Sequence, residues 1–134
     1  HTEIGADAQS KGIDYLYATG KLSIHADFNF HPTTLKHRRV NVLLYLNKNW
    51  QSHHEGCLEL WDKNMSSVQK SIEPIFNRLV VFTITDDAFH GHPVPFQGDE
   101  RLSFAFYYYT DNRPEHEKSP FHWAMWQRRP GKGY

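Results

Sequence analysis

The stretch Leu22-Ser23-Ile24-His25-Ala26-Asp27-Phe28 alternates polar and apolar side chains, which is the pattern of a half-buried β-strand. Successive side chains on a strand point to opposite faces, so His25 and Asp27 are predicted to project from the same face. An imidazole and a carboxylate held side by side supply two of the three ligands of a 2-His-1-carboxylate metal site, which leaves further coordination positions open. The stretch therefore predicts a metal site that needs one more histidine.

Short strand-like segments continue along the chain on both sides of this stretch. They are rich in β-branched and aromatic residues, turns separate them, and no segment has a helical period. The segments cover residues 14–19, 22–28, 38–47, 57–62, 66–73, 78–85, 88–94 and 102–110. About eight antiparallel strands with few or no helices predict an all-β core, a double-stranded β-helix or jelly roll.

Length and composition limit the possible classes of protein. The 134 residues predict a single domain, with a core at about 14–110 and a tail, 111–134, that packs on the core. Lys plus Arg and Asp plus Glu both number 15, so we expect no binding of nucleic acid or of an anionic membrane surface. A single cysteine, Cys57, fits a reducing compartment, and no apolar run approaches the roughly 20 residues of a membrane span. A cytoplasmic location is the expectation.

Two later histidines, His90 and His92 in the segment 89–93, are candidates for the third metal ligand. Both follow the strong strand predicted at 78–85, at a point where a jelly roll can fold back over His25. On an ideal strand the two rings point the same way. Spacing alone therefore leaves the choice between them open.

An arginine at the start of the last predicted strand indicates an anion site. Arg101 shares a strand face with Ser103, and a buried guanidinium is costly unless it has a partner. A bound carboxylate is the natural partner, and the hydroxyl of Tyr45 could bind the same anion. A metal with open positions beside such a pocket suits a small dicarboxylate that reaches both. By contrast, Arg38-Arg39 is expected to be a solvated strand end.

Several motifs, in this order along the chain, resemble those of the Fe(II)/2-oxoglutarate dioxygenases. The motifs are YATGKLSIHADFNFHP, RRVNVLLYLNKNW, GCLELWD, IEPIFNRLVVF, FHGHP and RLSFAFYYYT. Within that superfamily they are similar to the prolyl 4-hydroxylase group, which includes the oxygen-sensing prolyl hydroxylases and compact microbial and viral relatives. The resemblance runs from about Tyr15 to Thr110, and it implies the cofactors Fe(II), 2-oxoglutarate and O2, with ascorbate in support.

Residue by residue, the resemblance assigns roles to the positions that match the family motifs. It implies three iron ligands: His25, Asp27 and His90. It implies four residues that bind the cosubstrate: Arg101, Ser103, Tyr45 and Tyr17. Tyr15 is an alternative to Tyr17, because the short turn there leaves the match open. His92 then lies behind the ligands or on the substrate side.

The resemblance also implies an activity. The family hydroxylates a substrate C–H bond while 2-oxoglutarate gives succinate and CO2, and the group match implies a prolyl residue of a peptide or protein as the substrate. The carboxylate of Asp27 favours hydroxylation, since related halogenases have a small residue at that position. The alternative is a non-catalytic jelly-roll binding module with a structural or vacant metal site.

Two departures from the family pattern bear on these expectations. The gap between His90 and Arg101 is slightly longer than in the oxygen sensors, so we expect a reshaped loop there. The family also carries helices before the first core strand, and this chain has almost nothing in their place. Either a partner or the tail covers that sheet, or the chain is a fragment.

Overall fold

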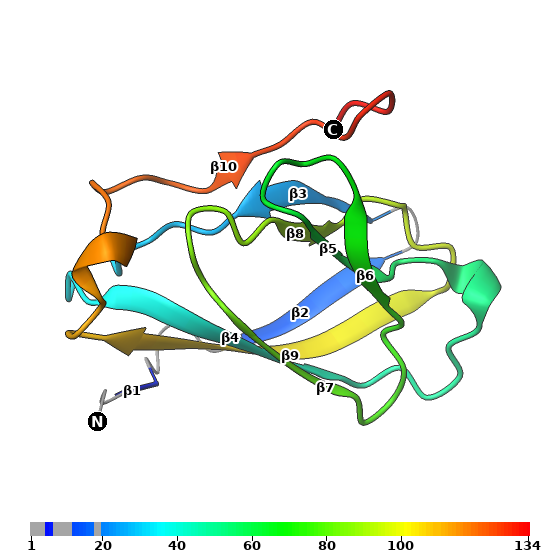
Figure 1. Ribbon diagram of the computed structural model, residues 1–134. Coiled ribbons are helices and arrows are strands. Elements are labelled where there is room, and N and C mark those ends of the chain that lie inside the picture. The colour runs from blue at the N-terminus through cyan, green and yellow to red at the C-terminus, as the bar shows by residue number, and fades with distance from the viewer. Residues whose placement is uncertain (1–4, 7–11, 18–19) are drawn as a thin grey trace.

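A computed structural model describes residues 5–6, 12–17 and 20–134, with side chains described from Gly20 onward. Its strands form two sheets that lie face to face (Figure 1). The first sheet contains β1 (Gly5–Ala6), β9 (Glu100–Thr110), β4 (His37–Tyr45) and β7 (Leu79–Thr83), and β2 (Gly12–Tyr17) also pairs with β9. The second contains β10 (Met125–Trp126), β3 (Leu22–Ala26), β8 (His90–His92), β5 (Leu58–Trp61) and β6 (Val68–Ile72).

The predicted all-β jelly roll is confirmed. Strands β2 to β9 correspond in order to the eight predicted segments, and the named strands pair antiparallel. Within the described ranges the only helical segments are two single 3-10 turns, η2 (Ser52–His54) and η3 (Glu115–Glu117). None of the helices described is long and apolar enough to cross a membrane.

The space between the sheets is filled from both sides. A buried cluster of Tyr45, Leu58 and Val80 joins β4, β5 and β7, and Leu43, Leu60, Ile72 and Phe82 pack against it. Strand alternation decides which residues of β9 face this interior. Arg101, Ser103 and Ala105 are each at most 3% exposed, so β9 brings a guanidinium and a hydroxyl into the core.

The C-terminal segment lies along the outer edge of the second sheet (Figure 1). Strand β10 pairs with β3, with Trp126 opposite His25, and the Gln127 amide donates to Ile24 O at 2.8 Å. The Trp126 ring packs on the His25 ring with centroids 4.9 Å apart. Phe121 and Trp123 contact each other and stay 49% and 67% exposed. The tail thus adds a strand to the sheet that carries His25.

Candidate metal centre and anion cavity

Strands β3 and β8 bring two histidines together in the second sheet. His25 and His90 are directly opposite each other in the antiparallel pair, and their ring centroids are 4.7 Å apart. The close approach of the two strands depends on Gly91, because a Cβ at that position would lie 2.8 Å from both Leu22 O and Ser23 O. The glycine between the two histidines of HGH therefore lets the strand that carries His90 pack this closely on β3.

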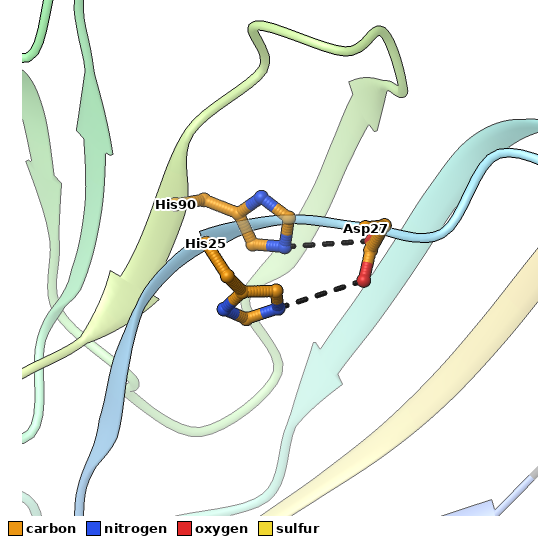
Figure 2. A group of neighbouring side chains, drawn as sticks. All are labelled: His25, Asp27 and His90. Atoms are coloured by element: carbon orange, nitrogen blue, oxygen red, sulfur yellow. Dashed lines mark ion pairs between the residues drawn. The ribbon is translucent and has the colours of Figure 1, made fainter. Parts of the chain in front are cut away.

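The two rings and the Asp27 carboxylate point at one another (Figure 2). The Nε2 atoms of His25 and His90 lie 3.5 Å from Asp27 Oδ1 and Oδ2 respectively. All three side chains are buried, and one ligating atom from each lies within 4.8 Å of the others. Among the described residues, this is the one group of three or more His, Cys, Asp or Glu side chains with such geometry.

Backbone carbonyls fix how the two imidazoles are protonated. His25 Nδ1 lies 2.9 Å from Ser23 O, and His90 Nδ1 lies 2.8 Å from Ala88 O. A carbonyl oxygen only accepts, so each Nδ1 carries hydrogen, and a neutral ring then presents the lone pair of Nε2 to Asp27. Burial lowers the pKa of His90 below 6.5, which favours the neutral ring.

The donor set fits a divalent cation. Two imidazole lone pairs and a carboxylate converge in a buried space, where such acceptors repel one another unless a positive charge lies between them. Nitrogen and oxygen ligands from two histidines and one carboxylate, on one side of the ion, are typical of non-haem Fe(II) sites. The hydrogen bonds at Nδ1 are the outer contacts that orient histidine ligands in metal sites.

Strand β4 of the opposite sheet holds the carboxylate in place. Asn41 Nδ2 donates to Asp27 Oδ2 at 2.8 Å, and an Arg38 Nη2 lies 3.1 Å from the same oxygen. Arg38 Nε and Nη2 also donate to Asn41 Oδ1, at 3.2 and 3.0 Å. Burial alone would raise the pKa of Asp27, but its neighbours, among them the Arg38 charge, outweigh burial and hold that pKa well below 3.8.

Arg38 corrects the expectation of a solvated strand end. It is 3% exposed, and its guanidinium lies 4.5 Å from the Phe28 ring centroid and 4.0 Å from that of Tyr107. The register of β4 against β9 shifts between Arg38 and Val40, and a bulge of this kind moves side chains to the other face. This shift places Arg38 on the inner face with Asn41. Arg39 instead pairs with Glu117 in the tail.

A cavity of about 360 Å³ extends from the three converging side chains between the two sheets. Arg101, Ser103 and Tyr45 line it together with the apolar side chains of Leu43, Leu58 and Phe82. Arg101 is 3% exposed; its Nε donates to Gly56 O at 2.9 Å and its Nη2 lies 3.3 Å from the Tyr45 hydroxyl. The cavity thus contains three side chains of the kind that bind metals and, elsewhere in its wall, the buried positive charge of Arg101.

His92 also lines this cavity but does not join the three ligating side chains. Its Nδ1 accepts a hydrogen bond from the Leu22 amide at 3.1 Å. Burial, and after it the Arg101 charge, lower the pKa of His92 from 6.5 to about 3. The geometry therefore brings His90, and not His92, beside His25 and Asp27.

Tyr17 and its alternative Tyr15 lie on β2. The backbone of β2 pairs Tyr17 with Glu100 and Tyr15 with Leu102, but both tyrosine side chains lie outside the described part of the structure. Arg38 and Asn41 contact Asp27 at this site, and sequence reasoning missed both positions. A doublet of arginines followed by an alternating strand gives no sign of the register shift that turns Arg38 inward.

A family model described as the 2OG-Fe(II) oxygenase superfamily matches residues 13–109. Among solved structures, the chain is similar to a prolyl hydroxylase from Trichoplax adhaerens in complex with a peptide fragment of the hypoxia inducible factor oxygen degradation domain. That match has 28% identity and a TM-score of 0.60, and it covers 74% of this chain and 42% of the other. No curated protein matches the sequence.

Two further structures share the fold. A Pseudomonas putida prolyl-4-hydroxylase has 24% identity and a TM-score of 0.57, covering 78% of this chain and 54% of that one. A prolyl 4-hydroxylase from Phytophthora capsici has 19% identity and a TM-score of 0.59, covering 90% and 40%. The chain therefore spans about half, or less, of the length of these structures.

Proposed function

The chain belongs to the 2OG-Fe(II) oxygenase superfamily, and we propose that it hydroxylates a prolyl residue of a peptide or protein with Fe(II), 2-oxoglutarate and O2. The observation that carries the proposal is the buried convergence of His25, Asp27 and His90 at one end of a cavity whose wall also holds Arg101. The overall reaction converts the C–H bond, O2 and 2-oxoglutarate into the alcohol, succinate and CO2.

In this proposal His25, Asp27 and His90 hold the metal, with Nε2 of each ring and a carboxylate oxygen as ligand atoms. Bound Fe(II) would supply the redox chemistry that couples decarboxylation of 2-oxoglutarate to hydroxylation of the substrate. The protein fixes the ligands before the ion arrives, because backbone carbonyls orient both rings and Asn41 holds the carboxylate.

Arg101, Ser103 and Tyr45 are proposed to bind the far carboxylate of 2-oxoglutarate. The Arg101 guanidinium is held in one orientation by Gly56 O, so little freedom is lost when the anion binds. An anion that pairs with Arg101 also neutralises a charge that is otherwise buried among apolar side chains. Leu43, Leu58 and Phe82 form apolar walls of the cavity and limit the access of water to it.

The prolyl substrate is supported by resemblance to enzymes of that group. The Trichoplax prolyl hydroxylase, which this chain matches over 74% of its length, was solved with a peptide bound. Asp27 supports hydroxylation specifically, because its carboxylate fills the position that a small residue leaves open for halide in related halogenases. Ascorbate is expected to sustain turnover by keeping the metal reduced.

Replacement of Asp27 tests the metal centre. We expect Asp27→Ala to abolish succinate formation from 2-oxoglutarate, with or without substrate. The reason is that two neutral imidazoles, without a negatively charged ligand, hold the ion weakly. Succinate is measured with Fe(II), 2-oxoglutarate and ascorbate present. Asp62→Ala, in a turn outside the cavity, is the matched control and should retain turnover. Full activity in Asp27→Ala would refute the ligand set.

A turnover screen tests the substrate class. Proline-containing peptides and free amino acids are incubated with the loaded enzyme, and products are read by mass for a gain of one oxygen atom. We expect oxygen gain in the peptides, in equal amount to the succinate formed. Oxidation of free amino acids alone would reject the peptide substrate and leave the oxygenase assignment intact. A non-catalytic binding module would form no succinate at all.

A further inference from the structure

The cavity wall holds one more polar residue, His92, to which the proposed function gives no role. His92 lies two residues after His90 on β8, so both side chains project from the same face of that strand. His92 is 7% exposed and lines the cavity with Arg101, Ser103 and Tyr45. A polar ring is thus buried in the wall between the two sheets.

A hydrogen bond from β3 determines which nitrogen of the His92 ring carries the hydrogen. The Leu22 amide donates to His92 Nδ1 at 3.1 Å, so Nδ1 is the acceptor nitrogen and the hydrogen of the neutral ring is on Nε2. This hydrogen bond fixes the tautomer of the neutral His92 ring. The Nε2–H of this tautomer is a donor in the wall of the cavity, where a ligand oxygen can accept from it.

Charge favours the same arrangement. His92 and Arg101 line the same cavity, so an anion that pairs with the guanidinium enters the space that the His92 ring also borders. A neutral donor in that wall adds to the guanidinium without adding a second positive charge. Arg101, the Tyr45 hydroxyl and His92 come from β9, β4 and β8 respectively, so both sheets would hold the anion.

We infer that His92 binds the cosubstrate by donating its Nε2–H to a carboxylate oxygen of 2-oxoglutarate. The inference rests on the proposed function, because it requires 2-oxoglutarate in this cavity. It extends that function by adding a neutral donor to the arginine, serine and tyrosine of the anion site. Donation requires the hydrogen of the neutral ring to be on Nε2, and the hydrogen bond from the Leu22 amide to Nδ1 favours that tautomer.

Binding of 2-oxoglutarate to the Zn²⁺-loaded protein, measured by titration calorimetry, tests the inference without turnover. We expect His92→Leu to weaken binding about 10-fold, because one hydrogen bond to a charged group is lost. His92→Gln keeps an N–H donor at that position and should recover most of the affinity. His53→Leu makes the same change at an exposed histidine outside this cavity and should leave the affinity unchanged.

A spectroscopic readout separates donation from a purely structural role. In protein with isotope-labelled histidine, the Nε2–H resonance that disappears in His92→Gln is assigned to His92. We expect this resonance to move downfield when 2-oxoglutarate is added, because the hydrogen bond to a carboxylate deshields the proton. An unchanged resonance, or unchanged affinity in His92→Leu, would overturn the inference.

Arg101→Ala makes the two failures distinguishable. We expect this variant to weaken 2-oxoglutarate binding about 100-fold through loss of a charged, multiply bonded partner. If Arg101→Ala weakens binding and His92→Leu does not, the role of His92 is wrong and the proposed anion site stands. If neither variant weakens binding, the anion site itself is wrong, and the inference falls with it.

Discussion

The two carboxylate oxygens of Asp27 have different surroundings. Oδ2 receives the Asn41 amide at 2.8 Å and lies 3.1 Å from the Arg38 guanidinium, whereas Oδ1 lies 3.5 Å from the His25 ring. An oxygen that already accepts a hydrogen bond and pairs with a guanidinium has less electron density to offer a cation. We therefore expect Oδ1 to be the stronger ligand atom, with Asn41 and Arg38 keeping the carboxylate turned to that orientation.

Loss of Asn41 should weaken metal binding without disrupting the fold. Asn41→Ala removes one donor to Oδ2 and frees the carboxylate to rotate, so we expect the affinity for Mn²⁺ to fall about 10-fold. The affinity is measured by titration of the metal-free protein. Asn47→Ala is the matched control, because Asn47 accepts the Leu102 amide and donates to Pro74 O away from the site. Equal Mn²⁺ affinity in Asn41→Ala and wild type would contradict the proposed orientation.

Arg38 should matter more to stability than its neighbour Arg39. Arg38→Met leaves the buried Asp27 charge without its guanidinium partner, so we expect the metal-free protein to lose about 3 kcal/mol of unfolding free energy. Arg39→Met breaks a pair with Glu117 that is partly exposed, and the expected loss is below about 1 kcal/mol. Denaturant unfolding measures both. Similar losses of unfolding free energy in the two variants would show that the buried Arg38–Asp27 pair stabilises the protein no more than the exposed pair does.

The residue scale also shows where sequence reasoning stops. The period of two on the 22–28 stretch is enough to place His25 and Asp27 on one face, and both are buried there. The same period misplaces Arg38, because the register shift between Arg38 and Val40 depends on how β4 pairs with β9. A single strand's pattern contains no information about its partner's register, so the inward turn of Arg38 could not be predicted.

At the scale of elements, the site depends on how closely β3 and β8 approach. Strand β8 is three residues long, and it places His90 opposite His25 while its glycine lies against the β3 backbone. Gly and Pro on either side of His92 weaken the strand pattern, yet a short strand at 88–94 is predicted after the turn at Asp86-Asp87. Strand β10 was not predicted as a strand, because two residues of pairing leave no periodic signal.

Gly91→Ala should push the two strands apart. The added methyl would lie 2.8 Å from Leu22 O and Ser23 O, so the backbone must shift and the two histidine rings shift with it. We expect the Mn²⁺ affinity to fall at least about 10-fold and the unfolding free energy to fall by about 2 kcal/mol. Titration and denaturant unfolding of the same sample measure the two effects.

The control for this change is Gly131→Ala. No atom lies within 4 Å of a Cβ at Gly131, so its cost is limited to the left-handed backbone, with φ of +70°. We expect some loss of stability in Gly131→Ala and no change in Mn²⁺ affinity. If Gly91→Ala binds Mn²⁺ as tightly as Gly131→Ala does, the close approach of β3 and β8 is not what positions the ligands.

At the scale of the whole molecule, neither sheet contains the site alone. The second sheet supplies both histidines, and the first supplies Asn41, Tyr45 and Arg101. The eight strands could be predicted from short-range patterns, since each pattern belongs to one segment. The number of strands also favours a jelly roll of two packed sheets. Contacts between residues as distant as Gly56 and Arg101, however, have no local signal.

A molecule that buries neutral histidines and an ionised aspartate should lose stability in acid. The pKa of His92 is about 3 in the folded protein and 6.5 ordinarily, so the unfolded chain binds the proton more readily. The stabilisation from the neutral ring is complete above about pH 6.5 and is lost as the pH falls toward 3. Asp27, whose pKa is also lowered, adds a loss of the same sign below its ordinary value of 3.8.

We therefore expect the metal-free protein to lose about 2 kcal/mol of unfolding free energy between about pH 7 and pH 5 through His92 alone. Denaturant unfolding at a series of pH values measures this slope. His92→Gln has no titrating ring, so its slope should be flatter, while His53→Gln, at an exposed position, should keep the wild-type slope. A wild-type slope in His92→Gln would mean that other groups cause the acid sensitivity. The difference between the two variants thus isolates the contribution of the His92 ring, whose pKa is lowered by burial and by the Arg101 charge.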